Sequence, residues 1–168
     1  FSTSASNYAV TASVITINGG TVTLNGSTVT LSNTSPFNYS SGTFNAGTST
    51  INLTGSATFA GAGLTFYNVT FPTTVTSTTG ITGANTFNNL KLPVPGLSNL
   101  YAFTLSADQI INGTLSSYAG SLPNYRIFVQ SNVQGTTRTL TCAAASSLTD
   151  IDFRDITIAG AAAPVSGT

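Results

Sequence analysis

The chain has 168 residues, of which 40% are hydrophobic and only 5% are charged, with four basic residues, four acidic residues and no histidine. An ordinary soluble domain carries about 25% charged residues. Intrinsic disorder does not explain the deficit, because disordered chains combine low hydrophobicity with high charge. Scarce basic residues argue against a nucleic-acid partner, and no apolar run of about 20 residues is present for membrane insertion.

All eight charged side chains lie in the second half, and residues 1–90 contain none. They are Lys91, Asp108, Arg126, Arg138, Asp150, Asp152, Arg154 and Asp155. A net charge near zero promotes self-association, and a neutral surface provides no electrostatic steering of ligands. We therefore expect self-association or contacts with other subunits of a fixed assembly.

Alternation of apolar and polar residues begins near residue 14 and predicts short β-strands with one apolar face, at 14–17, 21–24, 28–31 and 48–54. Turn sequences separate them, namely Asn18-Gly19-Gly20 and Asn25-Gly26. The strands that flank Asn25-Gly26 could form a two-residue hairpin. No segment combines helical periodicity with a capping sequence.

A six-residue motif recurs further along, in the form Phe, any residue, Asn or Asp, aliphatic, Thr or Lys, apolar. Copies start at Phe66, Phe87 and Phe153, so the intervals are 87 − 66 = 21 and 153 − 87 = 66, which is three times 22. Phe44 precedes the first copy by a similar interval, since 66 − 44 = 22. A fixed period in this range is typical of solenoids. We predict that these four phenylalanines form one core column.

The motif also predicts corners. In one continuous strand, a Phe at position i and aliphatic residues at i+3 and i+5 could not all face the core, because side chains alternate between the faces. The chain must therefore turn after the Phe. Asn and Asp tolerate the left-handed conformation better than other non-glycine residues, so Asn68, Asn89 and Asp155 are the predicted structural corners.

These observations predict an all-β fold, a parallel β-solenoid (β-helix) with about 22 residues per rung; a β-sandwich, which also has short strands and Gly-rich turns, is the alternative. We expect one β domain over 1–168, an excerpt of a longer polypeptide or a processed form. Regular rungs, uncharged apart from Lys91, are expected over 1–92, a less regular region over 93–125 and closing rungs over 126–168.

One acidic cluster surrounds Asp150 and Asp152, which lie two residues apart and would share a strand face. Such a pair could hold calcium or act as glycosidase carboxylates. We favour a solvated outer face, with Arg154 balancing the charges. Nucleophilic catalysis would need a base that the composition hardly supplies, and the single Cys142 excludes an internal disulfide. No catalytic, cofactor-binding or metal-binding residue is predicted, and we expect no enzymatic activity.

Four segments, AGTSTINLTGS (46–56), LTFYNVTF (64–71), ITGANTFNNL (81–90) and LTDIDFRDIT (148–157), resemble repetitive β-helical segments of large phage structural proteins. Autotransporter-type adhesins share this richness in Gly, Thr and Asn. The resemblance implies a virion fibre, spike or decoration component at the virion surface or outside the cell, often oligomeric, which takes part in assembly or binds host-surface glycans or proteins. A secreted bacterial or archaeal surface adhesin or filament subunit is the alternative, and a carbohydrate-cleaving β-helix enzyme is less favoured.

Overall fold

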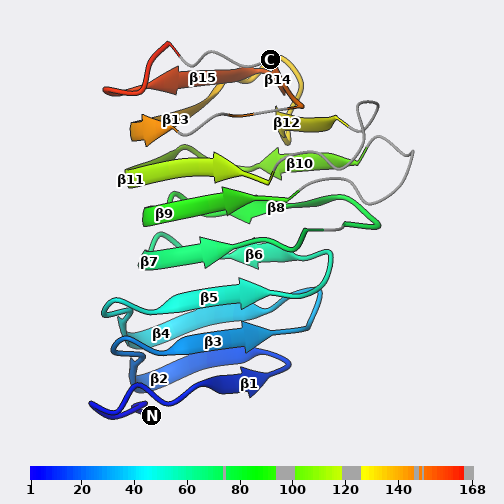
Figure 1. Cartoon of the computed structure of the whole chain (residues 1–168). Helices are drawn as coiled ribbons and strands as arrows, with labels where there is room; N and C mark the ends of the chain where they lie inside the picture. The colour runs from blue at the N-terminus through cyan, green and yellow to red at the C-terminus, as the bar shows by residue number, and fades with distance from the viewer. Residues whose placement is uncertain (74, 94–100, 119–125, 146–147, 149, 165–168) are drawn as a thin grey trace.

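The computed structural model describes residues 1–73, 75–93, 101–118, 126–145, 148 and 150–164. These residues coil into a parallel β-solenoid with about 22 residues per turn, and none of them is helical (Figure 1). The predicted fold class is therefore confirmed. The strands form three sheets, each of which runs along the axis of the coil.

The largest sheet contains every odd-numbered strand, in chain order. They are β1 (Val10–Ala12), β3 (Thr28–Leu31), β5 (Thr50–Leu53), β7 (Thr65–Thr70), β9 (Thr86–Leu92), β11 (Gln109–Ser117), β13 (Arg138–Ala145) and β15 (Ile156–Ala159). A five-stranded sheet contains β6 (Thr58–Ala60), β8 (Thr79–Thr82), β10 (Ala102–Leu105), β12 (Ile127–Ser131) and β14 (Ile151–Arg154). The third sheet pairs β2 (Ile15–Thr23) with β4 (Phe37–Asn45).

Every strand pairing in the described residues is parallel, and each strand pairs with strands one turn away along the coil. This excludes the β-sandwich, whose sheets are antiparallel. It also corrects the hairpin expected at Asn25-Gly26, because β2 and β3 belong to different sheets. Asn25 has a φ of 49° and turns the chain from one sheet to the next.

The length of a turn can be followed along one column of aligned residues in the eight-stranded sheet. The column consists of Val29, Ile51, Val69, Leu90, Leu115 and Ala145. Counted in residues, the steps between them are 51 − 29 = 22, 69 − 51 = 18, 90 − 69 = 21, 115 − 90 = 25 and 145 − 115 = 30. The period therefore stays near 22 in the N-terminal turns, which lie at the bottom of Figure 1, and lengthens toward the C-terminal end.

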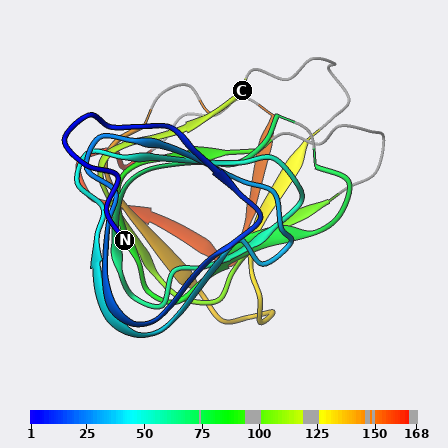
Figure 2. The same ribbon diagram turned by 90° about the horizontal axis from the view of Figure 1, so that it is seen from below.

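Seen from below, the chain winds around a common interior (Figure 2). Buried hydrophobic side chains fill this interior as one continuous core. Side chains in the middle turns are buried almost completely, as in Phe59, Phe87 and Phe103, each of which is 0% exposed. In the two edge strands of the eight-stranded sheet, β1 and β15, the side chains of Val10 and Ile156 are only partly buried. Burial of apolar surface, the main favourable term in folding, is therefore concentrated in the middle of the coil.

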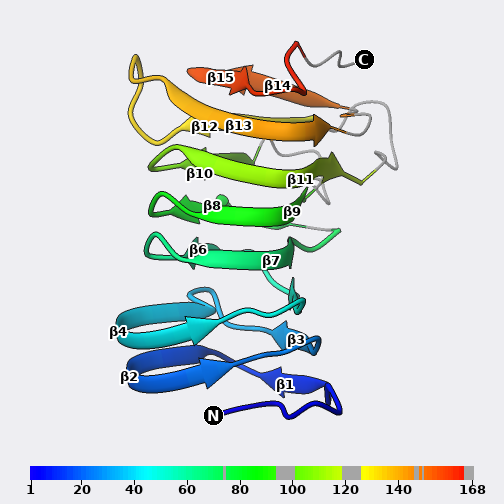
Figure 3. The ribbon, with the colours of Figure 1, turned by 90° about the vertical axis from the view of Figure 1, so that its left-hand side faces the viewer.

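The two-stranded sheet bends around one side of the lower turns (Figure 3). The expected turn at Asn18-Gly19-Gly20 lies inside β2, where it bends the strand instead of ending it. Gly42 follows the same bend in β4, with a φ of 109°. A Cβ atom at Gly42 would lie 2.6 Å from the carbonyl oxygen of Gly20, so the two bends stack only because these positions are glycines.

In the region that the sequence marks as less regular, 93–125, β10 and β11 continue both large sheets. Residues 94–100 and 119–125 of that region lie outside the described residues.

Candidate functional site

Phenylalanines gather in the interior of the lower and middle turns. Phe66 is 1% exposed, and its ring centroid lies 5.2 Å from that of Phe44 and 5.7 Å from that of Phe87. Two further members, Phe37 and Phe59, lie 5.2 Å and 4.9 Å from Phe66 and are not part of the sequence motif. Their own spacing, 59 − 37 = 22, is the signal in the sequence that could have found them.

Phe153 lies elsewhere. It belongs to β14, in register with Val129 and Phe103 of the five-stranded sheet. Phe87 is instead aligned with Ile111 of the eight-stranded sheet. The structure therefore places Phe153 in a different column from Phe66 and Phe87. The motif there spans two strands, β14 and β15, whereas in the two earlier copies the Phe and the following aliphatic residue share one strand.

Asn68 and Asn89 lie within β7 and β9, at a point where the strand bends. Neither has a positive φ, yet Phe66 and Val69, three residues apart, are both buried, so the chain changes direction between them. The two side chains stack in register and form a hydrogen-bonded ladder. Asn89 Nδ2 donates to Asn68 Oδ1 at 2.9 Å, and Asn68 Nδ2 donates to Thr50 Oγ1 at 3.1 Å.

The ladder continues upward, because the backbone N–H of Thr114 donates to Asn89 Oδ1 at 2.8 Å. Asp155, the third predicted corner residue, does have a positive φ of 56° and separates β14 from β15. Its carboxylate accepts a hydrogen bond from the backbone N–H of Gly135 at 3.0 Å. All three side chains thus connect one turn of the coil to its neighbour.

A second amide pair, which the sequence motif does not indicate, is buried at another corner. Asn85 and Gln109 are 1% and 0% exposed. Asn85 Nδ2 donates to Gln109 Oε1 at 3.1 Å, and Gln109 Nε2 donates to the carbonyl oxygen of Gly83 at 2.8 Å. Asn85 Oδ1 accepts from the backbone N–H of Gly63 at 2.9 Å. This network joins three consecutive turns.

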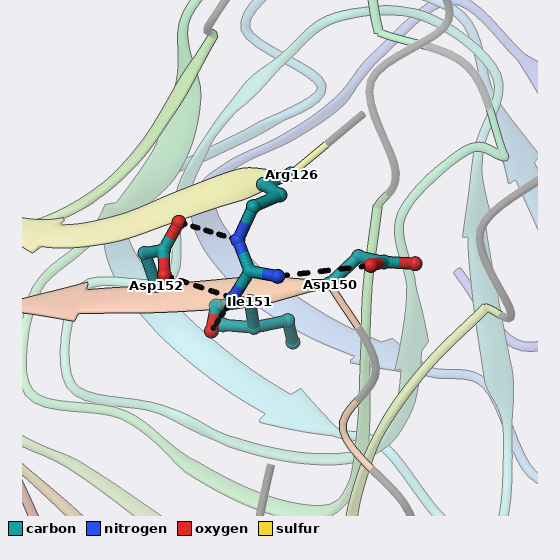
Figure 4. Close-up of polar contacts among 4 residues, drawn as sticks. All are labelled: Arg126, Asp150, Ile151 and Asp152. Carbon is teal, nitrogen blue, oxygen red and sulfur yellow. Dashed lines mark hydrogen bonds and ion pairs between the residues drawn. The ribbon is translucent and has the colours of Figure 1, made fainter. Parts of the chain in front are cut away.

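The acidic cluster is engaged by a cation from the preceding turn (Figure 4). The guanidinium of Arg126 donates to both oxygens of Asp152, at 2.8 Å and 2.9 Å, and its Nη1 lies 3.8 Å from Asp150 Oδ1. The sequence predicts Arg154 as the balancing charge, but the partner is a different arginine. Arg126 was hard to foresee because it is far from Asp152 in the sequence, at a separation of 152 − 126 = 26.

This geometry sets the electrostatics of the pair. The hydrogen bond from Arg126 lowers the pKa of Asp152, and the same contact raises the pKa of Arg126. Asp152 is therefore held in its ionised form, whereas a glycosidase general acid needs a raised pKa. Among the described residues, no group of three or more His, Cys, Asp or Glu side chains is placed to hold a metal ion.

Cys142 is buried in the core, and burial raises the pKa of its thiol to about 11. The thiolate is the reactive form of cysteine, so this side chain serves as a small apolar residue. It lies in register with Ile111 and thus continues the column of Phe87. In the part of the chain that the structure describes, no helix could span a lipid bilayer.

Two shallow grooves adjoin each other on the outside of the eight-stranded sheet. One, with a volume of about 360 Å³, follows the Asn68–Asn89 ladder to Lys91. There the Lys91 ammonium lies 3.7 Å from the centre of the Tyr118 ring, whose hydroxyl donates to the carbonyl oxygen of Phe71 at 3.2 Å; burial raises the pKa of that hydroxyl.

The other groove, of about 460 Å³, lies over the start of β7 and β9. Its lining includes Phe44, Asn45, Tyr67, Asn88 and Asn112. None of the described residues that line it is charged, and their polar side-chain groups are amides, a phenol and a hydroxyl. We call it the amide groove.

The chain was compared with known proteins by sequence and by structure. No protein-family model, characterised protein or solved structure matches it.

Proposed function

We propose that this chain is a structural and adhesive component of an external particle, of the kind that forms phage virion fibres, spikes and decoration proteins. The observation that carries the proposal is the coil itself, in which polar side chains connect each turn to the next by hydrogen bonds. Repeated stacking of this kind builds extended, quasi-one-dimensional structures.

The outer surface supports the proposal. Residues 1–90, which form β1 to β8 and most of β9, carry no charged side chain. Neighbouring copies or other subunits can therefore pack against these turns without like-charge repulsion and without the desolvation of ions. Hydroxyl and amide groups keep such a surface wettable while it is exposed.

The proposal also concerns the two edge strands of the eight-stranded sheet. β1 and β15 are the edge strands of the eight-stranded sheet, and the side chains of Val10 in β1 and of Ile156 and Ile158 in β15 are only partly buried. Open strand edges readily pair with further strands. In the proposed particle, adjoining chain or neighbouring subunits cover these edges.

Immunogold electron microscopy tests the proposal. Antibodies raised against this chain should label purified virions whose genome encodes it, at a defined position on the particle. Labelling of the cell surface or of secreted filaments, with none on virions, would contradict the virion assignment and favour the surface adhesin.

An enzymatic function has a separate test. The full chain should release no reducing sugar from surface polysaccharides of the source organism or its host. Measurable cleavage by the wild type that is lost in the Asp150→Asn/Asp152→Asn double variant would overturn the non-enzymatic proposal.

A further inference from the structure

The amide groove exists because the outline of the coil changes between two turns. From Phe44 to the next buried apolar residue, Ile51, the step is 51 − 44 = 7, whereas from Phe66 to Val69 it is 69 − 66 = 3. The longer path forms a loop that lies below the start of β7 (Figure 1). Gly47 gives this loop its shape, with a φ of 59°.

A bulge bounds the groove on its upper side. The register between β9 and β11 shifts by one residue between Ile111 and Leu115, which leaves Asn112 exposed. Gly113 lets the bulge lie close to β9, because a Cβ atom there would be 2.6 Å from the carbonyl oxygen of Asn88. Three strand spacings separate the lower loop from the bulge, a span of about 14 Å.

Three polar side chains along this span are without hydrogen-bond partners among the described residues, whereas Asn45, at the lower end, donates to Thr23 Oγ1. The side chains of Tyr67, Asn88 and Asn112 make no hydrogen bond within the described residues. Their immediate neighbours differ, since Asn68 and Asn89 are joined to each other and to adjacent turns. Adjacent amides on the same strands therefore do two different things: one pair holds the coil together, and the other side chains are available to a ligand.

We propose that the amide groove binds a neutral glycan chain that lies along the axis of the coil. Free amides both donate to and accept from sugar hydroxyls, and an aromatic ring such as that of Tyr67 offers an apolar surface to the C–H face of a sugar. The groove volume of about 460 Å³ lies within the range of small-molecule sites. This inference rests on the proposed adhesive function and assigns it a site.

The surroundings favour a glycan over other ligands. Strand addition by a peptide needs an open sheet edge, and β7 and β9 lie in the middle of the sheet, paired on both sides. An acidic glycan would need cations, but none of the described lining residues is charged. Lys91, in the adjoining groove, already contacts the Tyr118 ring.

A glycan array tests the inference. The full chain is applied to an array of neutral, sialylated and sulfated oligosaccharides, and the Kd of the strongest neutral oligosaccharide is then measured by titration. We expect binding to neutral glycans, with a Kd raised at least tenfold in Tyr67→Ala and in Asn88→Ala. Asn112→Ala should also raise the Kd. Because Asn112 is exposed at the bulge, this variant should fold normally even if one of the other two does not.

Matched controls lie outside the groove. Tyr8→Ala removes a tyrosine that is 68% exposed near the N-terminus, and Asn38→Ala removes an exposed asparagine of β4. Both should leave the Kd unchanged. Absence of binding to every neutral glycan, binding to charged glycans only, or a Kd that none of the groove variants changes would overturn the inference.

The two proposals fail separately. Virions that carry the immunogold label, together with a chain that binds no neutral glycan, would leave the proposed function standing and remove the glycan site. Glycan binding that depends on Tyr67 and Asn88, without label on virions, would keep the site and reassign the chain to another surface.

Discussion

In the described turns up to residue 90, the side chains that link one turn to the next are neutral amides and hydroxyls, whereas in the turns from β10 to β15 charged side chains do much of this work. Asn68 and Asn89 represent the first group. Arg126, Asp152 and Asp155 represent the second. The same backbone coil can thus be connected by either chemistry, but only the charged connections respond to pH. The predictions below test this difference, from the largest expected effect to the smallest.

Replacement of Phe66 by Ala should give the largest loss of stability. Its ring contacts four other phenylalanine rings in the interior, and a Phe→Ala change in a core costs about 3–5 kcal/mol. Chemical denaturation should show this loss. Phe153→Ala, at a partly buried position in the charged half, should cost less; an equal or larger loss would show that burial does not decline toward the end of the coil.

Asn85→Ala should lower the free energy of unfolding by about 2 kcal/mol, because it removes a buried amide together with its hydrogen bonds. The backbone N–H of Gly63 loses its acceptor, and Gln109 Oε1 loses one of its two donors, keeping the hydrogen bond from the backbone N–H of residue 85. Asn38→Ala, at an exposed position, is the control and should change stability by less than about 0.5 kcal/mol. Equal effects of the two replacements would contradict the role of the buried network.

Asn89→Ala should cost about 1 kcal/mol, since it interrupts a half-buried ladder and leaves the backbone N–H of Thr114 without its acceptor. The preceding residue provides a matched control on the same strand. Asn88→Ala removes a side chain without hydrogen bonds in the described structure and should be nearly neutral. Thermal melts of both variants would show whether neighbouring asparagines differ as proposed, and a larger cost for Asn88→Ala would contradict it.

Asp152→Asn should have the smallest effect at neutral pH, because both partners of the ion pair are more than a third exposed, at 40% for Arg126 and 38% for Asp152. The pKa of Asp152 is lowered in the folded state, so its contribution is present above the unfolded pKa of about 4 and is lost as pH falls below it. Melting temperatures measured across this range should fall more steeply in the wild type than in the variant. Parallel curves would argue against the linkage.

The fold class followed from the sequence because three phenylalanines, Phe44, Phe66 and Phe87, recur at nearly equal intervals of 22 and 21 residues. The later turns do not follow this spacing, because the steps from Leu90 to Leu115 and from Leu115 to Ala145 are longer, at 25 and 30 residues. Phe153 matched the motif by sequence alone, because a short motif does not specify which sheet its strand joins.

The site was less predictable than the fold. A turn sequence such as Asn25-Gly26 reports a local change of direction and does not distinguish a hairpin from a corner between sheets. The pairs Asn85–Gln109 and Arg126–Asp152 join residues 24 and 26 positions apart, and no repeat marks them. The amide groove depends on a turn that is four residues shorter than the average of about 22, as 22 − 18 = 4, and an average period conceals such a step.

Hydrogen exchange measured along the chain near pH 6 and near pH 3 tests the contrast between the two halves most directly. After correction for the intrinsic rate, the protection of backbone amides in β3, β5 and β7 should be the same at both values. Protection in β12 and β14, which the Arg126–Asp152 contact joins, should fall at the lower pH. An equal loss of protection in both regions, or a loss confined to β3, β5 and β7, would contradict the division into a neutral and a charged half.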